Sequence, residues 1–163
     1  MATMLRAVEV LKADSWQAAP VDRITLSYDE RHRRRLRFCA EGGTEFLLDL
    51  PRTTVLRDGD GLRLDDGRVI LVAAAAEPLL EVTAADSGQL ARLAWHIGNR
   101  HLPAQIGSGR ILIREDSVIE DMLTGLGASV RHVAEPFTPE PGAYDNSHSL
   151  LFAPGHAHGH GHG

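Results

Sequence analysis

The sequence predicts an α+β protein with a small antiparallel β domain first, a ferredoxin-like βαββαβ domain after it, and a disordered His-rich tail. Three observations predict this fold class. Apolar and polar residues alternate in the first half of the chain, apolar residues recur at helical spacing in the second half, and four histidines fall in the last eight residues. We expect the three parts to cover residues 1–75, 79–145 and 146–163, with a linker at 73–78.

Short strands joined by tight turns are expected in the first half. Their apolar segments are 24–28, 35–38, 45–50, 62–64 and 69–72. Asp58-Gly59 and Asp66-Gly67 are typical turn residues between such strands. Strands this short are stable only when several share one buried face, so they predict a small barrel or sandwich.

Two helices are expected in the second half. Apolar residues recur at i, i+3, i+4 and i+7 over 90–97 and again over 119–126, which places them on one helical face. The expected capping residues are Asp86 with Gln89, Ser117 with Glu120, and Gly127. Strand-like segments lie at 79–83, 104–106, 110–114 and 129–133. The order β-α-β-β-α-β is that of the ferredoxin-like motif.

Composition excludes several classes of protein. A single cysteine, Cys39, excludes an intrachain disulfide and a Cys-rich zinc or iron–sulfur site. No apolar run approaches the roughly 20 residues of a membrane span. Arg6 and Glu9 stand where a signal peptide would be apolar, so we expect a cytoplasmic protein without a membrane partner. A net charge of −5 argues against general nucleic-acid binding.

The sequence has no recognised catalytic motif. It lacks a Gly-rich phosphate loop, a Gly-x-Ser-x-Gly elbow and a His-Glu-x-x-His pair. We therefore expect no enzyme activity. A metal-dependent hydrolase using His96 or His101 with Asp116 is an alternative without any recognised spacing.

The alternating histidines of the last segment predict metal binding. They are His156, His158, His160 and His162. Neutral imidazole is a good ligand for zinc, copper and nickel, and small spacers let several rings reach one ion. A purification tag is an alternative interpretation, although such tags are usually contiguous His runs.

Two further histidines, His96 and His101, flank a predicted helix end. They are five residues apart, so they do not share a helical face and are not expected to chelate one ion within a subunit. Pro103 stops the helix, which places His101 at or just beyond its end, where a side chain projects. On composition alone, either residue is more often a surface or core histidine than a ligand.

The segment 31–37 contains five arginines in seven residues. We interpret it as a turn that enters a strand with a basic solvent face. A nucleic-acid patch and a docking site for an acidic partner protein are the alternatives. Few aromatic residues lie nearby to stack on bases, which weakens the nucleic-acid alternative.

The segment 96–106, His-Ile-Gly-Asn-Arg-His-Leu-Pro-Ala-Gln-Ile, resembles the signature of the UreE family of nickel metallochaperones. Residues 120–128 resemble the second helix of that family, and 136–144 resemble the segment before its His-rich end. The resemblance covers roughly residues 79–162 closely. It covers the first half only by architecture.

The resemblance implies a homodimer that delivers Ni(II) to the urease apoprotein together with other accessory proteins, including a GTPase. The family's metal histidine follows Gly-Asn-Arg, which here is His101. The two copies of His101 would meet across the dimer axis, and the tail histidines would complete the metal shell. Because nickel lies below copper in the Irving–Williams order, we expect Cu(II) and Zn(II) to bind in vitro as well.

One segment departs from the family pattern. Some members carry further metal histidines where this chain has Glu115-Asp116-Ser117, so secondary binding would rest on the tail, on His148 or on His96. His132 is expected to be structural. A His-rich storage or detoxification protein without a urease client is the main alternative function, and an RNA or protein adaptor using 31–37 is another.

Overall fold

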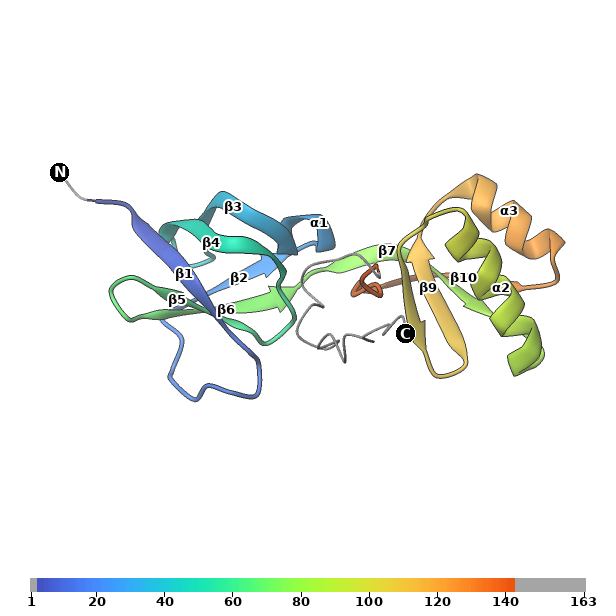
Figure 1. Cartoon of the computed structure of the whole chain (residues 1–163), viewed down its shortest axis with the longest axis horizontal. Coiled ribbons are helices and arrows are strands. Elements are labelled where there is room, and N and C mark those ends of the chain that lie inside the picture. Colours follow the sequence, from blue (N-terminus) through green and yellow to red (C-terminus); the bar gives the residue numbers. More distant parts are fainter. Residues whose placement is uncertain (1–2, 143–163) are drawn as a thin grey trace, which may run out of the picture.

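The computed structural model describes residues 3–142, which form a mixed α+β fold with two sheets (Figure 1). The first sheet contains β1 (Leu5–Leu11), β2 (Asp22–Leu26), β3 (His32–Cys39), β4 (Glu45–Val55), β5 (Gly61–Leu64) and β6 (Val69–Ala74). The one-turn helix α1 (Tyr28–Arg31) lies between β2 and β3. Within the described residues, no helix is long and apolar enough to cross a membrane.

The first sheet has the strand order β2-β6-β5-β1-β4-β3 and is mixed. The prediction of an antiparallel domain is wrong, because β1 pairs with β4 and β2 pairs with β6 in parallel. Tight turns specify only antiparallel pairs between sequence neighbours, such as β5 with β6. The predicted alternation is confirmed on β2, where Ile24 and Leu26 are buried and Arg23 and Thr25 are exposed.

The second sheet has the strand order β10-β7-β9-β8, with every neighbouring pair antiparallel. Its elements are β7 (Ala76–Thr83), α2 (Ser87–Asn99), β8 (Ala104–Gly107), β9 (Arg110–Arg114), α3 (Ser117–Gly125) and β10 (Ser129–Pro136). Both helices cover the same face of this sheet (Figure 1). Leu93 and Ile97 of α2 and Leu123 of α3 pack there against Leu80 and Ile113 of the strands.

The helix caps differ in part from those predicted. Asp86 caps α2 by accepting a hydrogen bond from the Gln89 backbone N, as expected. Asp116 caps α3, and not Ser117, because its carboxylate accepts from the two backbone N–H groups that follow Ser117. Gly127 has φ +91° and ends α3, as expected, in the left-handed conformation that glycine adopts freely.

The segment 73–78 was expected to be a linker, and this prediction is wrong. Strand β6 continues to Ala74 and β7 begins at Ala76, so one residue separates the strands. Pro78 lacks a backbone N–H. It is tolerated in β7 because only β10 pairs with the strand at this position, through Ala134, and the ladder to β9 begins at Leu79.

The two sheets meet at a buried contact. The side chain of Arg31 is fully buried and donates hydrogen bonds to the backbone oxygens of Leu26, Leu56 and Phe137. Phe137 follows β10 and is also fully buried, with its ring edge-on to Tyr28 of α1. Arg31 is therefore not part of a basic solvent face, in contrast to the sequence prediction. A one-turn helix with a capping box at Ser27 turns it inward.

Candidate metal site around His101

His101 lies immediately beyond α2 in a left-handed backbone conformation. Its φ is +56°, and it is the one residue other than glycine with a positive φ in the described part of the chain. Its backbone N donates to Gly98 O at 3.0 Å, and Leu102 N donates to Ile97 O at 3.4 Å. These two bonds form a Schellman motif in which His101 occupies the position usually taken by glycine.

The cap fixes His101 between two anchored residues. Ile97 is buried in the core and Leu102 packs against the same cluster, which gives the apolar contact typical of this motif. Pro103 follows, and β8 begins at Ala104. Helix α2 ends at Asn99, and the His101 side chain is exposed just beyond it. This confirms the prediction that His101 lies beyond the helix end with its side chain projecting.

The left-handed conformation has a cost. An L-residue with a Cβ pays roughly 1–2 kcal/mol there. Histidine adopts the left-handed region more often than most residues with a Cβ, but much less freely than glycine. Backbone strain of this kind is concentrated at functional sites, where the side chain is needed for another purpose. The conformation was not predicted from the sequence, although the apolar residues Ile97 and Leu102 on either side of the helix end are its signal.

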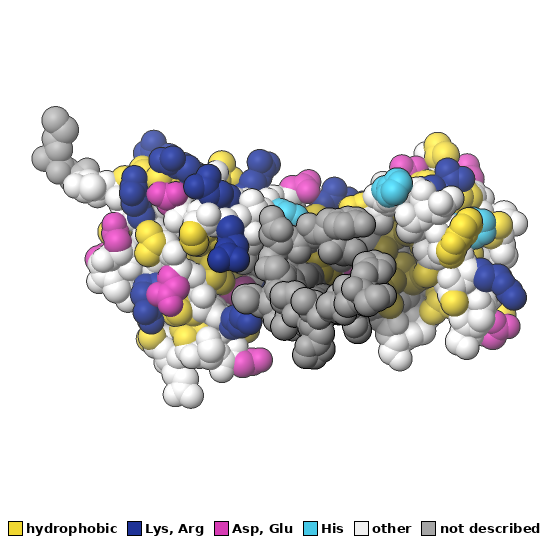
Figure 2. Space-filling view, in the orientation of Figure 1, with side chains coloured by type: hydrophobic (Ala, Val, Ile, Leu, Met, Phe, Trp, Pro, Cys, Tyr) yellow, Lys and Arg dark blue, Asp and Glu magenta, His cyan; other side chains and the backbone are white. Residues whose placement is uncertain are grey.

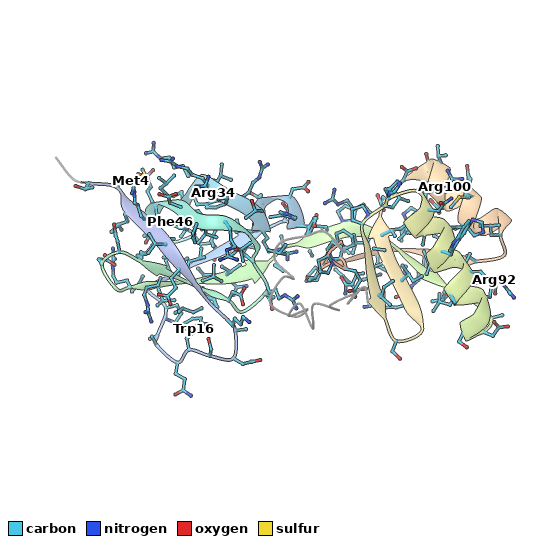
Figure 3. The ribbon with its side chains drawn as sticks, in the orientation of Figure 1. Met4, Trp16, Arg34, Phe46, Arg92 and Arg100 are labelled. Carbon is cyan, nitrogen blue, oxygen red and sulfur yellow. The ribbon has the colours of Figure 1, made fainter. Side chains whose placement is uncertain are left out.

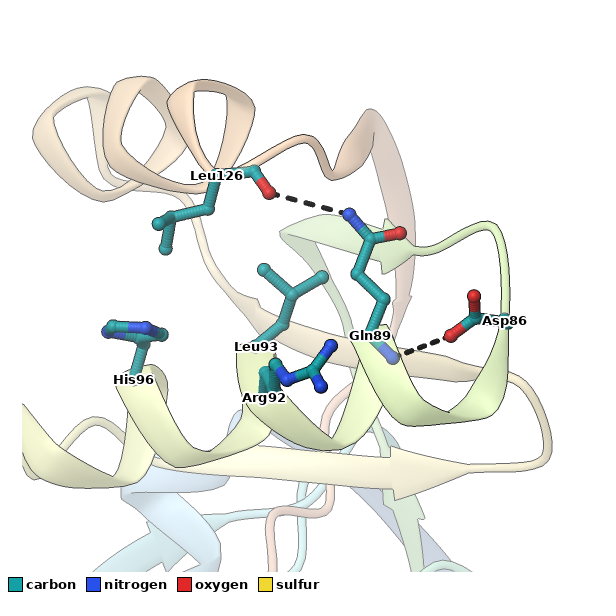
Figure 4. A pocket seen from close by; sticks show the side chains of 6 residues that line it. All are labelled: Asp86, Gln89, Arg92, Leu93, His96 and Leu126. Carbon is teal, nitrogen blue, oxygen red and sulfur yellow. Dashed lines mark hydrogen bonds between the residues drawn. The ribbon is translucent and has the colours of Figure 1, made fainter.

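His96 lies on α2 itself and faces a different direction. Its ring is half-buried and stands edge-on to Trp95, with ring centroids 5.1 Å apart. It lines a cleft of about 360 Å³ together with residues of α2 and the end of α3 (Figure 4). The one carboxylate of this cleft, Asp86, caps α2, and Arg92 brings a positive charge. Asp86 also lies ten residues before His96, about 15 Å along the helix axis, so the cleft offers His96 no second metal ligand within reach.

No described group of three His, Cys, Asp or Glu side chains is arranged to hold a metal ion. Of the predicted ligands, the structure describes His101 and His96. It does not bring them together on one helical face, since α2 ends at Asn99. His148 and the four tail histidines lie outside the described residues.

The chain returns toward His101 after β10. Gln105 Oε1 accepts a hydrogen bond from Thr138 N at 2.9 Å, and Ala104 O accepts one from Glu140 N at 2.8 Å. Ala104 is three residues from His101, which is at most about 11 Å along an extended chain. The last described residues before the predicted tail thus lie close to His101.

A second cleft of about 270 Å³ lies beside Leu102 and Pro103. Two acidic residues line it, Glu115 and Asp116. Asp116 is committed to capping α3, and Glu115 forms a hydrogen bond with His132. This arrangement disfavours the alternative in which Asp116 acts in a hydrolase.

His132 on β10 is held between two carboxylates. Its Nδ1 lies 2.7 Å from Glu115 Oε1, and its Nε2 lies 2.9 Å from Glu120 Oε1. Hydrogen bonds to Glu115 and then to Glu120 raise the pKa of His132, because both favour the protonated ring. The two nitrogens point to different carboxylates, so the cluster ties α3 to β10 as a structural contact.

This contact predicts a pH dependence of stability. Because the folded-state pKa of His132 is raised, its contribution is fully present below the unfolded value of about 6.5 and is lost as pH rises through the folded value. We expect the free energy of unfolding, measured by urea denaturation at several pH values, to decrease over that window. In His132→Gln this decrease of the unfolding free energy with pH should vanish, whereas His96→Gln should show it as the unmodified protein does. Identical slopes in all three proteins would contradict the assignment.

The chain matches two family models. Residues 3–75 match the model described as UreE urease accessory protein, N-terminal domain, and residues 77–163 match its C-terminal domain. The chain is 53% identical to the urease accessory protein UreE of Bradyrhizobium sp. (strain ORS 278) over 96% of this chain and 71% of the relative. It is 50% identical to the protein of the same name from Rhodobacter capsulatus over 99% of this chain and 98% of the relative. The UreE of Chelativorans sp. (strain BNC1) is 56% identical over 86% of this chain and 87% of the relative.

Both sheets therefore lie within matched regions, and the segment that carries His101 lies within the C-terminal match. The resemblance stated for residues 79–162 is confirmed and extends to the first half of the chain. The chain belongs to the UreE family of urease accessory proteins.

Proposed function

We propose that this protein is a nickel metallochaperone that binds Ni(II) at His101 and delivers it during assembly of the urease metallocentre. The observation that carries the proposal is the exposed imidazole held in a strained backbone conformation at the end of α2. Membership in the UreE family supports the role in urease maturation. We propose no catalytic activity.

A single exposed histidine is a weak metal site, so the proposal includes a homodimer. A two-fold axis beside His101 would supply two imidazoles from two copies of the same surface. Large apolar side chains are exposed on the elements around His101, with Trp95 of α2 62% exposed and Ile106 of β8 50% exposed. Exposed apolar residues of this kind are typical of protein–protein contacts.

The His-rich tail is proposed to gather metal and to complete the shell. Its histidines are His156, His158, His160 and His162, with His148 and His96 as secondary ligands. Glu140 is bonded beside Ala104, and the chain from Glu140 to His156 spans up to roughly 50 Å when extended. That reach is sufficient for the tail to meet His101.

The ligand chemistry suits a carrier. Imidazole without thiolate favours borderline divalent ions, and the one cysteine, Cys39, lies on β3 of the other sheet. We expect Cu(II) and Zn(II) to bind the purified protein as well, so nickel identity would come from availability and partners.

The remaining parts of the proposal concern organisation. We assign 1–75 and 79–145 to two domains and 146–163 to the tail, with ferredoxin-like topology in the second domain. The order β10-β7-β9-β8 supports that topology. We place the protein in the cytoplasm, where its partners would be the urease apoprotein and other accessory proteins including a GTPase.

Nickel titration calorimetry tests the metal sites. We expect the intact protein to bind several ions per dimer, and a form truncated after Phe152 to keep one tight ion per dimer. His101→Ala should lose that tight ion, whereas His96→Ala should retain it. If truncation abolishes all binding and His101→Ala changes nothing, the protein is a His-tail buffer.

Urease activation separates delivery from storage. Nickel-loaded protein, added to urease apoprotein and the other accessory proteins with a competing chelator present, should activate urease more than free nickel does. His101→Ala should lose this advantage. Equal activation by free nickel would favour the storage alternative.

A further inference from the structure

The outer edge of the first sheet is strongly basic. Five exposed arginines form what we call the arginine edge: Arg33, Arg34, Arg35 and Arg37 of β3, and Arg52 of β4. Figure 2 shows Lys and Arg side chains gathered along this side of the first sheet, and Arg34 marks its place in Figure 3. The concentration contrasts with the net charge of −5 of the whole chain.

These arginines lack carboxylate partners among the described residues. Elsewhere in the same part of the chain, Arg63, Arg68, Arg110, Arg114 and Arg131 each form an ion pair of 3.2 Å or shorter. No member of the arginine edge forms one, and Arg34 donates only to Leu50 O. Asp49 lies opposite Arg35 in the β3–β4 register, but its ion pair at 3.6 Å is with Arg6. The edge therefore carries uncompensated positive charge.

The arginine edge also has open main-chain groups. Strand β3 is the last strand of its sheet and pairs only with β4. Its register is irregular between Arg33 and Arg35 and is continuous from Arg35 to Cys39. Every second backbone N–H and C=O of that stretch therefore faces away from β4, as in any edge strand.

The two faces of β3 differ in chemistry. Arg35 and Arg37 alternate with Leu36 and the buried Phe38, so the arginines lie on one face and the apolar residues on the other. Leu36 is 36% exposed. A strand placed alongside would meet positive charge on one face and an aliphatic side chain on the other.

We propose that the arginine edge docks an extended segment of a partner protein in which acidic and aliphatic residues alternate, added as a strand beside β3. Arg binds carboxylates through two parallel hydrogen bonds, and the open backbone supplies the remaining contacts. A protein segment is favoured over nucleic acid because the aromatic residues of β3 and β4, Phe38 and Phe46, are buried and present no stacking surface. The proposal does not depend on the metal site.

Fluorescence anisotropy with a short labelled peptide of alternating Glu and Val tests this docking. We expect binding that weakens as salt rises, and no comparable binding of a Gln-Val peptide. Arg35→Ser/Arg37→Ser should lower the affinity by about tenfold or more. The matched control is Arg63→Ser/Arg68→Ser, which removes two positive charges from β5 and from the β5–β6 turn, and it should change the affinity by less than about threefold.

Three further measurements test the docking: binding of a backbone-methylated peptide, peptide binding by His101→Gly, and binding of a single-stranded oligonucleotide. A Glu-Val peptide N-methylated at alternate residues keeps its charge and loses backbone donors, so it should bind much more weakly. His101→Gly should bind the peptide like the unmodified protein, which separates this result from any failure of the metal site. No peptide binding, equal loss in both arginine variants, or tighter binding of a single-stranded oligonucleotide would each overturn the proposal.

Discussion

Replacing His101 with glycine should abolish the tight nickel ion and raise the free energy of unfolding of the metal-free protein. His101 occupies the left-handed position of the α2 cap, where a Cβ costs roughly 1–2 kcal/mol. Glycine removes that strain, but its greater conformational freedom stabilises the unfolded chain and offsets roughly 0.5–1 kcal/mol of the gain. We expect a net gain of about 0.5–1 kcal/mol, measured by urea denaturation with a chelator at matched protein concentration.

Two other substitutions at the same position separate strain from ligand chemistry. His101→Ala removes the imidazole and keeps the Cβ, so its stability should stay near that of the unmodified protein. His101→Asn should lie between alanine and glycine, since asparagine tolerates the left-handed region. All three variants should lose the tight ion in calorimetry. A glycine variant that unfolds more easily, or that still binds nickel tightly, would show that His101 is held there for a different reason.

Replacing Arg31 with leucine should cause the largest loss of stability. The change leaves the backbone oxygens of Leu26, Leu56 and Phe137 without their shared donor in a fully buried site. Each unsatisfied buried group costs about 1–3 kcal/mol, so we expect a loss of roughly 3–5 kcal/mol. Arg34→Leu is the control, because Arg34 is exposed and donates to one carbonyl, and it should cost less than about 1 kcal/mol.

The same variant tests whether Arg31 couples the two sheets. The chain has two tryptophans, Trp16 before β2 (Figure 3) and Trp95 on α2, so each half carries one fluorescent reporter. With Trp95→Phe or Trp16→Phe as background, the two urea transitions should coincide in the presence of Arg31. They should separate in Arg31→Leu. Transitions that stay together and only shift would show that Arg31 adds stability without coupling the halves.

Most of the secondary structure was predictable from local patterns of apolar residues. The helical spacing over 90–97 and 119–126 identified α2 and α3, because each helix needs one continuous apolar face whatever it packs against. The apolar stretch 45–50 identified the first part of β4, although the strand continues through Pro51 to Val55. The sequence also located His101 just beyond a helix end, since Pro103 prevents the helix from continuing.

Patterns of neighbouring residues do not specify which strands pair, or which groups meet, when they are far apart in the sequence. The parallel pairing of β1 with β4 and of β2 with β6 joins segments about forty to fifty residues apart, which no turn specifies. The burial of Arg31 depends on the backbone oxygen of Phe137, over a hundred residues away. From its neighbours alone, an arginine in a run of arginines is expected to face solvent.

The sequence by itself determined helices α2 and α3, most of the strands, the family and the candidate ligands, because these depend on local periodicity and on motifs of neighbouring residues. It missed strand β1 and the one-turn helix α1, and it counted Tyr28 of α1 as part of a strand. Only the tertiary structure decided the sheet pairings, the buried contact of Arg31 and the left-handed backbone of His101. Each of these is set by groups that meet only when the chain folds. For His101, the deciding groups are Ile97 and Leu102, whose burial in the core of the second sheet closes the cap around it.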